Sequence, residues 1–500
     1  MKIFSALQIK EWDAYTIAHT PITSLNLMER AAVACFKWIQ LTYGAEKNYT
    51  VFCGTGNNAG DGLALARMMY DENISVNVFI VGDIEHASAD FLSNLERLKK
   101  TSVSIQQINS AENIPELPTG IIIDCIFGTG LNKSPEGIYR SLIGVINQSG
   151  KKIISIDMPS GLFADKTSKG NTVINATHTL TFQSVKLAFL MAENESYVGE
   201  MHVLDIGLDE HFSETEKSNY FFTEENQIKK LLRPRKLHAH KGVFGHALLI
   251  GGSHGKMGAL ILSSKACLRS GVGLLTVSIP ESENSILQTT VPEAMTETNE
   301  LAANDLEKYT AFGIGPGWGT DDAAQKQLHF ILQQYKKPVV LDADALNCLS
   351  LNKEWLKLLP TNSIITPHPK EFERLFGRTE NDFARLELAR QQAALYKIFI
   401  VLKGHYTAII TPDGEIHFNS TGNAGMAKGG SGDVLTGIIT GLLAQGYSSK
   451  DAVLLGAYLH GLAGDIAALE FSQEAMTASD IIHKLSKAFR RLNLNDKAPD

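Results

Sequence analysis

The sequence predicts a two-domain α/β protein in which each domain contains a mainly parallel sheet flanked by helices. Three observations support this prediction. The chain has 500 residues, which is more than one small core needs. Short β-branched runs alternate with longer helical patterns along the whole chain. The chain also holds 42 Gly but only 15 Pro, which favours glycine turns between elements over proline-rich linkers.

The first series of strands occupies roughly the first third of the chain. We expect strands at residues 49–54, 75–82, 120–128 and 151–159, and a helix that starts near Asp61. These runs are apolar on both faces and are followed by Gly-rich turns, a pattern typical of parallel strands in βαβ units. Between residues 205 and 235 the sequence becomes polar and shows no strong strand, so we expect the domain boundary near residues 212–228.

A second series of strands follows this polar segment. We expect strands at residues 246–252, 273–280, 309–315, 337–344, 362–369 and 398–404. A Pro-Asp-Gly turn at 412–414 between two apolar runs predicts a hairpin. The apolar stretches 434–446 and 452–468 are expected to be core helices. Because the two series share no order of motifs, we expect two different domains, 1–215 and 225–500.

Charge and cysteine content exclude several classes of protein. Lys and Arg number 46 and Asp and Glu number 54, a net charge of −8, so a nucleic-acid backbone or an acidic membrane is not an expected partner. The five cysteines are scattered without a CxxC spacing, which indicates buried thiols in a reducing compartment. The N-terminus turns charged early, so we expect a cytoplasmic protein. His238, His240 and His246 lack carboxylate or Cys neighbours at ligand spacing, which favours surface or hinge roles over a metal cluster.

The segment GTGNNAGDG (54–62) joins a predicted strand to a predicted helix. Its small residues allow close backbone approach, and N–H groups at a helix N-terminus favour an anion. The segment lacks both the Rossmann and the P-loop pattern, so it fits a phosphate site or a tight structural turn. Strand-end oxygens of Asn58, Asp124, Asp157 and Ser160 are expected to meet in one crevice, although each residue alone also fits a cap or a turn.

Taken together, GTGNNAGDG, DCIFGTGL (124–131) and IDMPSGL (156–162) resemble the NAD(P)H-hydrate epimerase family over residues 1–215. The family has a glycine where this chain has Ala59, a change that matters only if the position needs a positive φ. The resemblance implies a Rossmann-like three-layer α/β domain, K⁺ held by Asn58, Asp124 and Ser160, and proton transfer by Asp157. The substrate contacts that it implies are Asn57, Asn58, Ala59, Gly60, Asp61, Gly128, Thr129, Gly130, Leu131, Asn132, Lys133, Ser134 and Asp157.

In the second half, NAGMAKGGSGD (423–433) precedes an apolar helix. Its backbone N–H groups can hold a phosphate beside Asp433, which is the arrangement that phosphoryl transfer needs. The simpler interpretation is a Gly-rich helix start capped by Asp433. GGSHGKMGA (251–259) fits a substrate loop or a turn, and His368, between two prolines, fits a core histidine or a ligand.

With GGSGD, the segments FGIGPGWG (312–319), LDADALN (341–347), TPHPKEFERL (366–375) and VLKGHYT (401–407) resemble the NAD(P)H-hydrate dehydratase family of the ribokinase-like superfamily, over residues 228–495. The resemblance implies that Asp433 is the general base and that Mg²⁺ accompanies ADP. The implied hydrate contacts are Ala259, Gly317, His368 and Asp433. The implied nucleotide contacts are Lys403, Gly404, His405, Tyr406, Thr407, Gly429, Gly430, Ser431 and Gly432.

The two halves together resemble the bifunctional NAD(P)H-hydrate repair enzymes. This resemblance implies epimerisation of the R and S hydrates and nucleotide-dependent dehydration of the S hydrate, with release of AMP and phosphate if ADP is used. The motifs do not separate ADP from ATP. Two alternatives stay open, a small-molecule kinase with a stable product in the second half and a non-catalytic sensor or scaffold in the first. We expect small-molecule substrates and a homo-oligomer.

Overall fold

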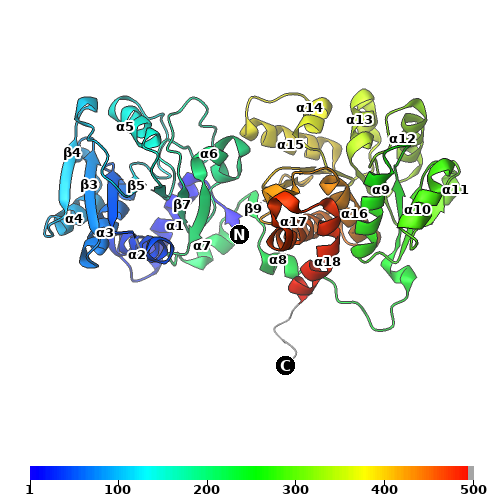
Figure 1. Cartoon of the computed structure of the whole chain (residues 1–500), viewed down its shortest axis with the longest axis horizontal. Helices are drawn as coiled ribbons and strands as arrows, with labels where there is room; N and C mark the ends of the chain where they lie inside the picture. Colours follow the sequence, from blue (N-terminus) through cyan, green and yellow to red (C-terminus); the bar gives the residue numbers. More distant parts are fainter. Residues whose placement is uncertain (45, 494–500) are drawn as a thin grey trace. The chain divides into compact units, whose positions relative to one another are not determined.

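The computed structural model describes residues 1–44 and 46–493, which form two compact units (Figure 1). The N-terminal unit consists mainly of residues 2–218, and the C-terminal unit consists mainly of residues from Asn219 onward. Each unit contains a largely parallel sheet with helices, so the predicted two-domain α/β class is confirmed.

The sheet of the N-terminal unit is wholly parallel. Its strands lie in the order β4 (Ser104–Ile108), β3 (Ser75–Val81), β2 (Asn48–Cys53), β5 (Ile121–Cys125), β6 (Ile153–Ile156), β7 (His178–Phe182) and β8 (Glu200–Leu204). Four of these strands match the predicted runs, although β5 and β6 are shorter. The sequence did not predict β4, β7 and β8, because their polar and exposed residues interrupt any continuous apolar run. Chain order reverses at β2, which pairs with both β3 and β5.

Helices cover both faces of this sheet. The helices α2 (Ser24–Tyr43), α3 (Asn57–Asp71) and α4 (Ala89–Leu98) pack on the face that carries Val51 and Ile123. The helix α5 (Gly137–Gln148) packs on the opposite face, which carries Phe52 and Ile122, because neighbouring strand residues point to opposite sides. The helix α3 begins at Asn57 and not near Asp61 as expected, so the NNAGD segment forms its first turns.

The sheet of the C-terminal unit lies in the order β9 (Tyr220–Phe222), β18 (Ile416–Phe418), β17 (Ala408–Ile410), β16 (Phe399–Leu402), β15 (Ile364–Ile365), β14 (Val339–Leu341), β13 (Ala311–Ile314), β10 (His246–Ile250), β11 (Leu274–Ser278) and β12 (Met295–Glu297). The strands β17 and β18 are antiparallel, which confirms the predicted hairpin. Chain order reverses at β10, which pairs with β11 and β13. The segment expected to lack strands contains β9, whose three residues are too few to show a pattern.

The helices α9 (Met257–Arg269), α16 (Ser431–Ala444), α17 (Ser449–Ala475) and α18 (Ala478–Asn493) pack together on one face of this sheet (Figure 1). On the other face Phe312 stacks on Tyr335, which follows α12 (Asp322–Gln334). The helix α17 is long and apolar enough to cross a membrane by length and composition. However, 72% of its apolar window is buried in the structure, as expected of a core helix.

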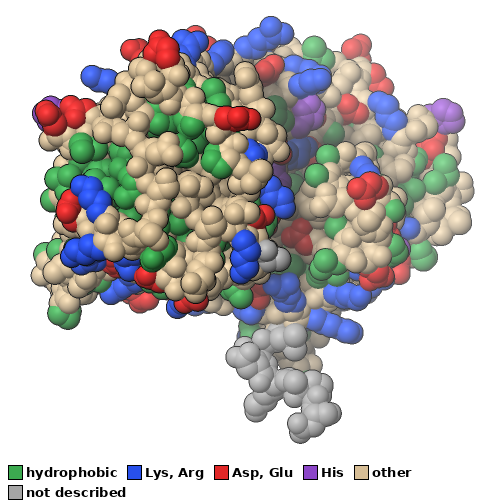
Figure 2. Space-filling view, turned by 60° about the vertical axis from the view of Figure 1, so that its left-hand side comes forward, with side chains coloured by type: hydrophobic (Ala, Val, Ile, Leu, Met, Phe, Trp, Pro, Cys, Tyr) green, Lys and Arg blue, Asp and Glu red, His purple; other side chains and the backbone are tan. Residues whose placement is uncertain are grey.

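The remaining elements are short or peripheral. They are β1 (Lys2–Ile3), α1 (Ala6–His19), α6 (Glu195–Val198), α7 (Glu210–Thr215), α8 (Glu225–Lys229), α10 (Asn284–Thr290), α11 (Ala303–Leu306), α13 (Ala343–Leu351), α14 (Pro369–Phe376) and α15 (Asp382–Tyr396). All five cysteines are buried and unpaired, as predicted. Figure 2 shows basic and acidic side chains interspersed over the face that it displays, in keeping with the net charge of −8.

Candidate active sites

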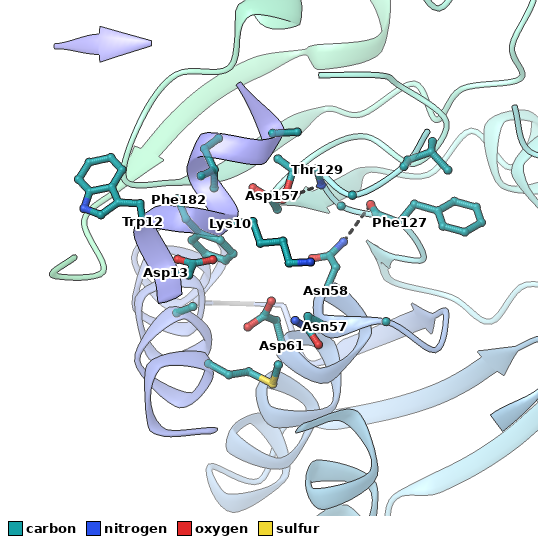
Figure 3. Close-up of a pocket in the computed structure, with 18 of the residues that line it drawn as sticks. Lys10, Trp12, Asp13, Asn57, Asn58, Asp61, Phe127, Thr129, Asp157 and Phe182 are labelled. Atoms are coloured by element: carbon teal, nitrogen blue, oxygen red, sulfur yellow. Dashed lines mark hydrogen bonds between the residues drawn. The ribbon is translucent and has the colours of Figure 1, made fainter. Parts of the chain in front are cut away.

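A cavity of about 730 Å³ lies in the N-terminal unit at the carboxyl ends of β2 and β5, where the strand order reverses (Figure 3). Open α/β sheets bind their ligands at this point of the topology. The predicted residues that line the cavity are Asn57, Asn58, Asp61, Gly128, Thr129, Gly130, Leu131, Asn132, Lys133 and Asp157. The structure therefore brings the segments after β2 and β5 into one cavity, together with Asp157 after β6.

Three of the predicted contact residues lie elsewhere. Ala59 is fully buried in the core, and a side chain on Gly60 would clash with Met28, because both positions face the packing between helices. Ser134 bonds to Asn171 outside the cavity lining. Ala59 is helical without a positive φ, so alanine is accommodated there without backbone strain.

Asp157 is held in a constrained position directly after β6. Its backbone has φ +62°, a conformation that is strained for a non-glycine residue and that is found more often at functional sites. Its Oδ2 accepts the N–H of Thr129 at 3.0 Å, and its Oδ1 lies 3.3 Å from Nζ of Lys186, a lysine only 1% exposed. A Cβ on Gly128 would lie 3.0 Å from Oδ2 of Asp157, so a glycine lets the loop after β5 approach the carboxylate.

Two further acids face the same cavity. Asp13 on α1 and Asp61 on α3 point toward Asp157 in Figure 3. Burial raises the pKa of Asp13 to about 6, and the neighbouring Asp157 carboxylate adds to the shift. Burial raises the pKa of Asp61 well above its usual range, and the carboxylates of Asp157 and Asp13 contribute. Burial and the neighbouring carboxylates therefore both favour the protonated form of Asp61, the form that can donate a hydrogen bond.

Sequence reasoning selected Asp61 and Asp157 but missed Asp13 and Lys186. Asp13 lies on an N-terminal helix and Lys186 follows β7, so neither belongs to a glycine-rich motif. The one available signal for Lys186 was a lone lysine within the otherwise apolar stretch SVKLAFL.

A cluster of oxygen atoms lies beneath the cavity floor. Asp124, which is fully buried near the end of β5, accepts bonds from Oγ of Ser155 at 2.8 Å and from N and Oγ of Ser160 at 2.8 and 2.5 Å. Asn58 donates its Nδ2 to the carbonyl of Phe127 at 3.0 Å. Its Oδ1 is buried and has no hydrogen-bond partner among the described residues. A buried acceptor in this state leaves an oxygen available for a cation.

In the C-terminal unit, Asp433 lies in the first turn of α16. The N-cap residue Gly430 has φ +93°, and no side chain caps the helix, so the first N–H groups are available to an anion. Burial raises the pKa of Asp433 to about 6; the Asp342 carboxylate adds to the shift and Lys403 opposes it. The carboxyl group of Asp433 therefore loses its proton just below neutral pH and can then act as a base.

Lys403 is held near Asp433 by two other acidic residues. Its Nζ donates to Oδ1 of Asp342 at 2.8 Å and lies 3.8 Å from Oε2 of Glu371. Asp342 follows β14, and its other oxygen accepts the hydroxyl of Thr436 at 2.7 Å. A Cβ on Gly432 would lie 3.3 Å from Nζ of Lys403, so the predicted nucleotide residues Lys403 and Gly432 are neighbours.

The other predicted nucleotide residues fall into two groups. Gly404, His405, Tyr406 and Thr407 form the turn between β16 and β17, where Thr407 donates its hydroxyl to the carbonyl of Gly404 at 3.1 Å. Gly429, Gly430 and Ser431 lead into α16. Asp342 and Glu371 were not selected from the sequence, although both lie inside segments that carried the family resemblance.

The predicted hydrate contacts lie at neighbouring strand ends. Ala259 is in the first turn of α9 after β10, and Gly317 follows β13 with φ +62°. A Cβ on Gly317 would lie 3.2 Å from Cβ of Ala259 and 2.5 Å from the carbonyl oxygen of Lys256. The absence of a side chain at Gly317 therefore lets the loop after β13 lie close to the start of α9.

His368 has a structural role that leaves one ring nitrogen available. It is the N-cap of α14, and its Nδ1 accepts the N–H groups of Lys370 at 3.1 Å and Glu371 at 3.4 Å. Burial lowers the pKa of His368, and Lys403 adds to the effect, so the ring is neutral. Because Nδ1 is the acceptor, the ring hydrogen is on Nε2, which can donate to a ligand.

Two α/β units, each with a strand-end or helix-start aspartate beside a glycine-rich turn, define an enzyme with two separate sites. Residues 24–188 match the family model described as YjeF-related protein N-terminus, and residues 247–487 match the model described as NAD(P)H-hydrate dehydratase. The chain belongs to the family of bifunctional NAD(P)H-hydrate repair enzymes.

This membership rests on relatives along nearly the whole chain. A bifunctional NAD(P)H-hydrate repair enzyme Nnr of Moorella thermoacetica is 34% identical over 98% of this chain and 97% of the relative. The enzyme of the same name from Escherichia coli is 35% identical over 93% of this chain and 90% of the relative. A crystal structure of an ADP/ATP-dependent NAD(P)H-hydrate dehydratase from Bacillus subtilis, co-crystallised with ATP and Mg²⁺, is 35% identical with a TM-score of 0.50 and covers 55% of this chain and 99% of its own.

Proposed function

We propose that the N-terminal unit, corresponding to the predicted domain 1–215, interconverts the R and S forms of NAD(P)H-hydrate. The C-terminal unit, the predicted domain 225–500, dehydrates the S form to NAD(P)H with ADP and releases AMP and phosphate. One observation carries the proposal: each unit has its own aspartate, Asp157 or Asp433, near a lysine and a glycine-rich turn at the carboxyl ends of its strands. Two sites of this kind support two successive reactions on one substrate.

In the epimerase site, Asp157 handles the proton that is moved around the C6 centre of the hydrate. Lys186 and the Thr129 N–H hold its two oxygens, which orients the carboxylate toward the cavity. Asp61, whose pKa is raised by burial, would supply a donor in the same cavity when it is protonated. Asn57 and the loop 128–133 bind the nucleotide part of the substrate through backbone groups, as the anion-favouring start of α3 permits.

Asn58, Asp124 and Ser160 would hold K⁺ in this unit. The three residues offer only oxygen atoms, and the unpartnered Oδ1 of Asn58 supports the fit. The ion would supply a fixed positive charge near the phosphates of the bound hydrate.

In the dehydratase site, Asp433 accepts the proton of the hydrate hydroxyl while that oxygen takes the terminal phosphoryl group of ADP, and AMP leaves. The nitrogen lone pair of the ring then expels phosphate, and loss of a proton from the neighbouring carbon restores the double bond. The N–H groups of residues 429–432 stabilise the charge on the transferred phosphoryl group.

The surrounding residues bind the two substrates of this reaction. Ala259, Gly317 and the Nε2–H of His368 contact the hydrate, and the turn 403–407 contacts the adenine nucleotide. Mg²⁺ would neutralise the nucleotide phosphates. The fit is supported by the carboxylates of Asp342, Glu371 and Asp344, the last in the first turn of α13, which all act on Asp433.

A single assay tests this assignment. The full chain is incubated with mixed R and S hydrates of NADH, ADP, Mg²⁺ and K⁺, while NADH absorbance is followed and the remaining hydrate is resolved by chiral chromatography. We expect complete conversion, with one AMP and one phosphate for each NADH. A stable phosphorylated product would instead identify a kinase, and an R fraction that remains after the S form is consumed would make the N-terminal unit a binding module.

Two properties of the whole protein also belong to this proposal. A cytoplasmic location is supported by five buried, unpaired cysteines, which suit a reducing compartment. A homo-oligomer remains a prediction that light scattering of the purified chain would check.

A further inference from the structure

Two histidines and a glutamate meet on the N-terminal unit, at the end of the sheet opposite the cavity. His178 is the first residue of β7, and Glu200 is the first residue of β8. Since His178 pairs in register with Glu200, and Leu180 pairs with His202, all three side chains lie on the same face of the sheet. The cavity lies at the carboxyl ends of the strands, so this cluster is separate from it.

The distances within the cluster match those between ligands of one metal ion. Nδ1 of His178 lies 3.2 Å from Nε2 of His202, and the carboxylate of Glu200 lies 3.5 Å from the first nitrogen and 3.7 Å from the second. Zinc bonds of about 2.0–2.2 Å in a tetrahedral site place neighbouring ligand atoms about 3.3–3.6 Å apart. The three side chains are therefore already arranged like three corners of such a tetrahedron.

Neighbouring groups on α2 hold both rings in this orientation. The hydroxyl of Tyr43 lies 2.7 Å from Nε2 of His178, the nitrogen that faces away from the cluster. A partner on the ring nitrogen that faces away from the cluster fixes the orientation of the imidazole, as the outer partners of metal-binding histidines do. The indole of Trp38 packs against both imidazoles, with ring centres 5.0 and 4.5 Å away.

The environment favours binding and leaves access for an ion. Burial lowers the pKa of both histidines, which favours the neutral imidazoles that bind metal ions. Nδ1 of His178 and Nε2 of His202 share a hydrogen bond in the structure, and a bound ion would replace it. The imidazoles are 12% and 22% exposed, whereas the Glu200 side chain is 68% exposed. The cluster is thus open to solvent on the side of Glu200, where a water molecule could occupy a fourth position.

We propose that His178, Glu200 and His202 bind one divalent transition-metal ion, for which Zn²⁺ has the matching geometry. Two imidazoles and one carboxylate suit Zn²⁺, whereas Mg²⁺ and K⁺ prefer sites made of oxygen alone. The ion would link the edge strand β8 to β7 and fix both against α2. This site is independent of the two catalytic reactions, and its test needs neither hydrate nor nucleotide.

The test uses the tag-free full chain, stripped with a chelator and titrated with Zn²⁺ by calorimetry. We expect one ion per chain, binding weakened by more than about 100-fold in His202→Ala, and binding weakened by about 10-fold in Tyr43→Phe, because orienting partners of ligands contribute about that much. His86→Ala removes an exposed histidine of the same unit and should bind as the unchanged protein does.

A second measurement identifies the geometry and guards against a folding defect. Co²⁺ in place of Zn²⁺ should give the strong visible absorption of a four-coordinate ion, and Zn²⁺ but not Mg²⁺ should raise the melting temperature. Glu200→Gln changes only an exposed side chain, so it should fold and lose both effects even if His202→Ala unfolds. Full-affinity zinc binding in Glu200→Gln and His202→Ala, or a weak six-coordinate cobalt spectrum, would overturn the proposal.

Discussion

The two aspartates that we propose as catalytic, Asp157 and Asp433, have the same kinds of neighbours in different arrangements. In the N-terminal unit the buried Lys186 contacts Asp157 itself, at 3.3 Å. In the C-terminal unit Lys403 donates to the neighbouring Asp342 at 2.8 Å, and the pKa of Asp433 is raised to about 6. A lysine that pairs with the reactive carboxylate fixes its position, whereas a lysine that pairs with the adjacent carboxylate leaves the reactive one free to take up a proton.

The largest expected effect separates the two sites by activity. Asp433→Asn keeps the shape of the side chain but cannot accept a proton, so the dehydration rate should fall by about 10² to 10⁴ while epimerisation continues. NADH formation from pure S hydrate measures the first effect and chiral chromatography the second. Asp322→Asn, an exposed position in the same unit, serves as control. A variant that keeps more than about half of the dehydration rate would remove Asp433 from the mechanism.

Loss of the other aspartate should affect stability as well as activity. Asp157→Ala removes the carboxylate beside the buried Lys186, whose Nζ then keeps only the carbonyls of Phe182 and Ser184, so we expect a loss of about 1–3 kcal/mol in the free energy of unfolding. Urea denaturation should therefore show a larger loss for Asp157→Ala than for Asp433→Ala, since Lys403 keeps Asp342. Equal losses of stability in the two variants would mean that Lys186 does not depend on Asp157 more than Lys403 depends on Asp433.

In a mixture of hydrates, Asp157→Ala should consume the S form and then stop with R hydrate remaining. Mixing it with Asp433→Asn should restore complete conversion, because the hydrate can diffuse between the two proteins. A mixture of folded variants that remains stalled would indicate direct transfer within one chain or a mistaken division of labour between the units. Chiral chromatography of the remaining hydrate distinguishes these two causes.

The raised pKa of Asp433 predicts that the dehydration rate, but not the epimerisation rate, depends on the protonation of this residue at acidic pH. Only the carboxylate form can accept the hydroxyl proton, so the dehydration rate should fall as pH decreases through about 6, approaching tenfold per pH unit below it. The residual rate of Asp433→Asn should lack this decrease. The profile is measured on pure S hydrate, so that epimerisation does not contribute. An unchanged decrease in the variant would assign the titration to another group.

The cation site should matter for one unit only. Asp124→Ala removes a buried acceptor of two serine hydroxyls, so the ion site should be lost and hydrate binding by the N-terminal unit should weaken. The dependence of the epimerisation rate on K⁺ concentration measures this effect. Slower dehydration of pure S hydrate by the same variant would contradict the assignment.

The smallest expected difference compares two glycines. A Cβ at residue 128 would lie 3.0 Å from Oδ2 of Asp157 and 3.1 Å from Cβ of Asn58, two groups held by their own contacts. A Cβ at residue 432 would lie farther from its neighbours, 3.3 Å from Nζ of Lys403 and 3.7 Å from Oδ2 of Asp342. Gly128→Ala should therefore reduce epimerisation several-fold, and Gly432→Ala should reduce dehydration less. The opposite order would show that the glycines serve the backbone and not the neighbouring side chains.

Much of the architecture could be predicted from the sequence, because strands, turns and helix starts leave local patterns. The runs that became β2, β10 and β16 are continuous and apolar, and the Pro-Asp-Gly turn at 412–414 produced the expected hairpin. Asp433 was identified because it follows a turn whose residue types indicate an anion site, and Asp157 because it lies at a predicted strand end within a segment that resembles the epimerase family. These features depend on neighbours within a few positions along the chain.

The sequence by itself determined the two α/β domains, many of their strands, and the motifs at the strand ends. Only the tertiary structure decided that Asp13 and Lys186 face Asp157, that Lys403 pairs with Asp342, and that Ala59 belongs to the core. It also brought His178 to His202, whereas the sequence drew attention to the histidines at 238 and 240. The physical reason is that a local pattern sets which face a residue takes, while strand register and helix packing set which distant residue it meets there.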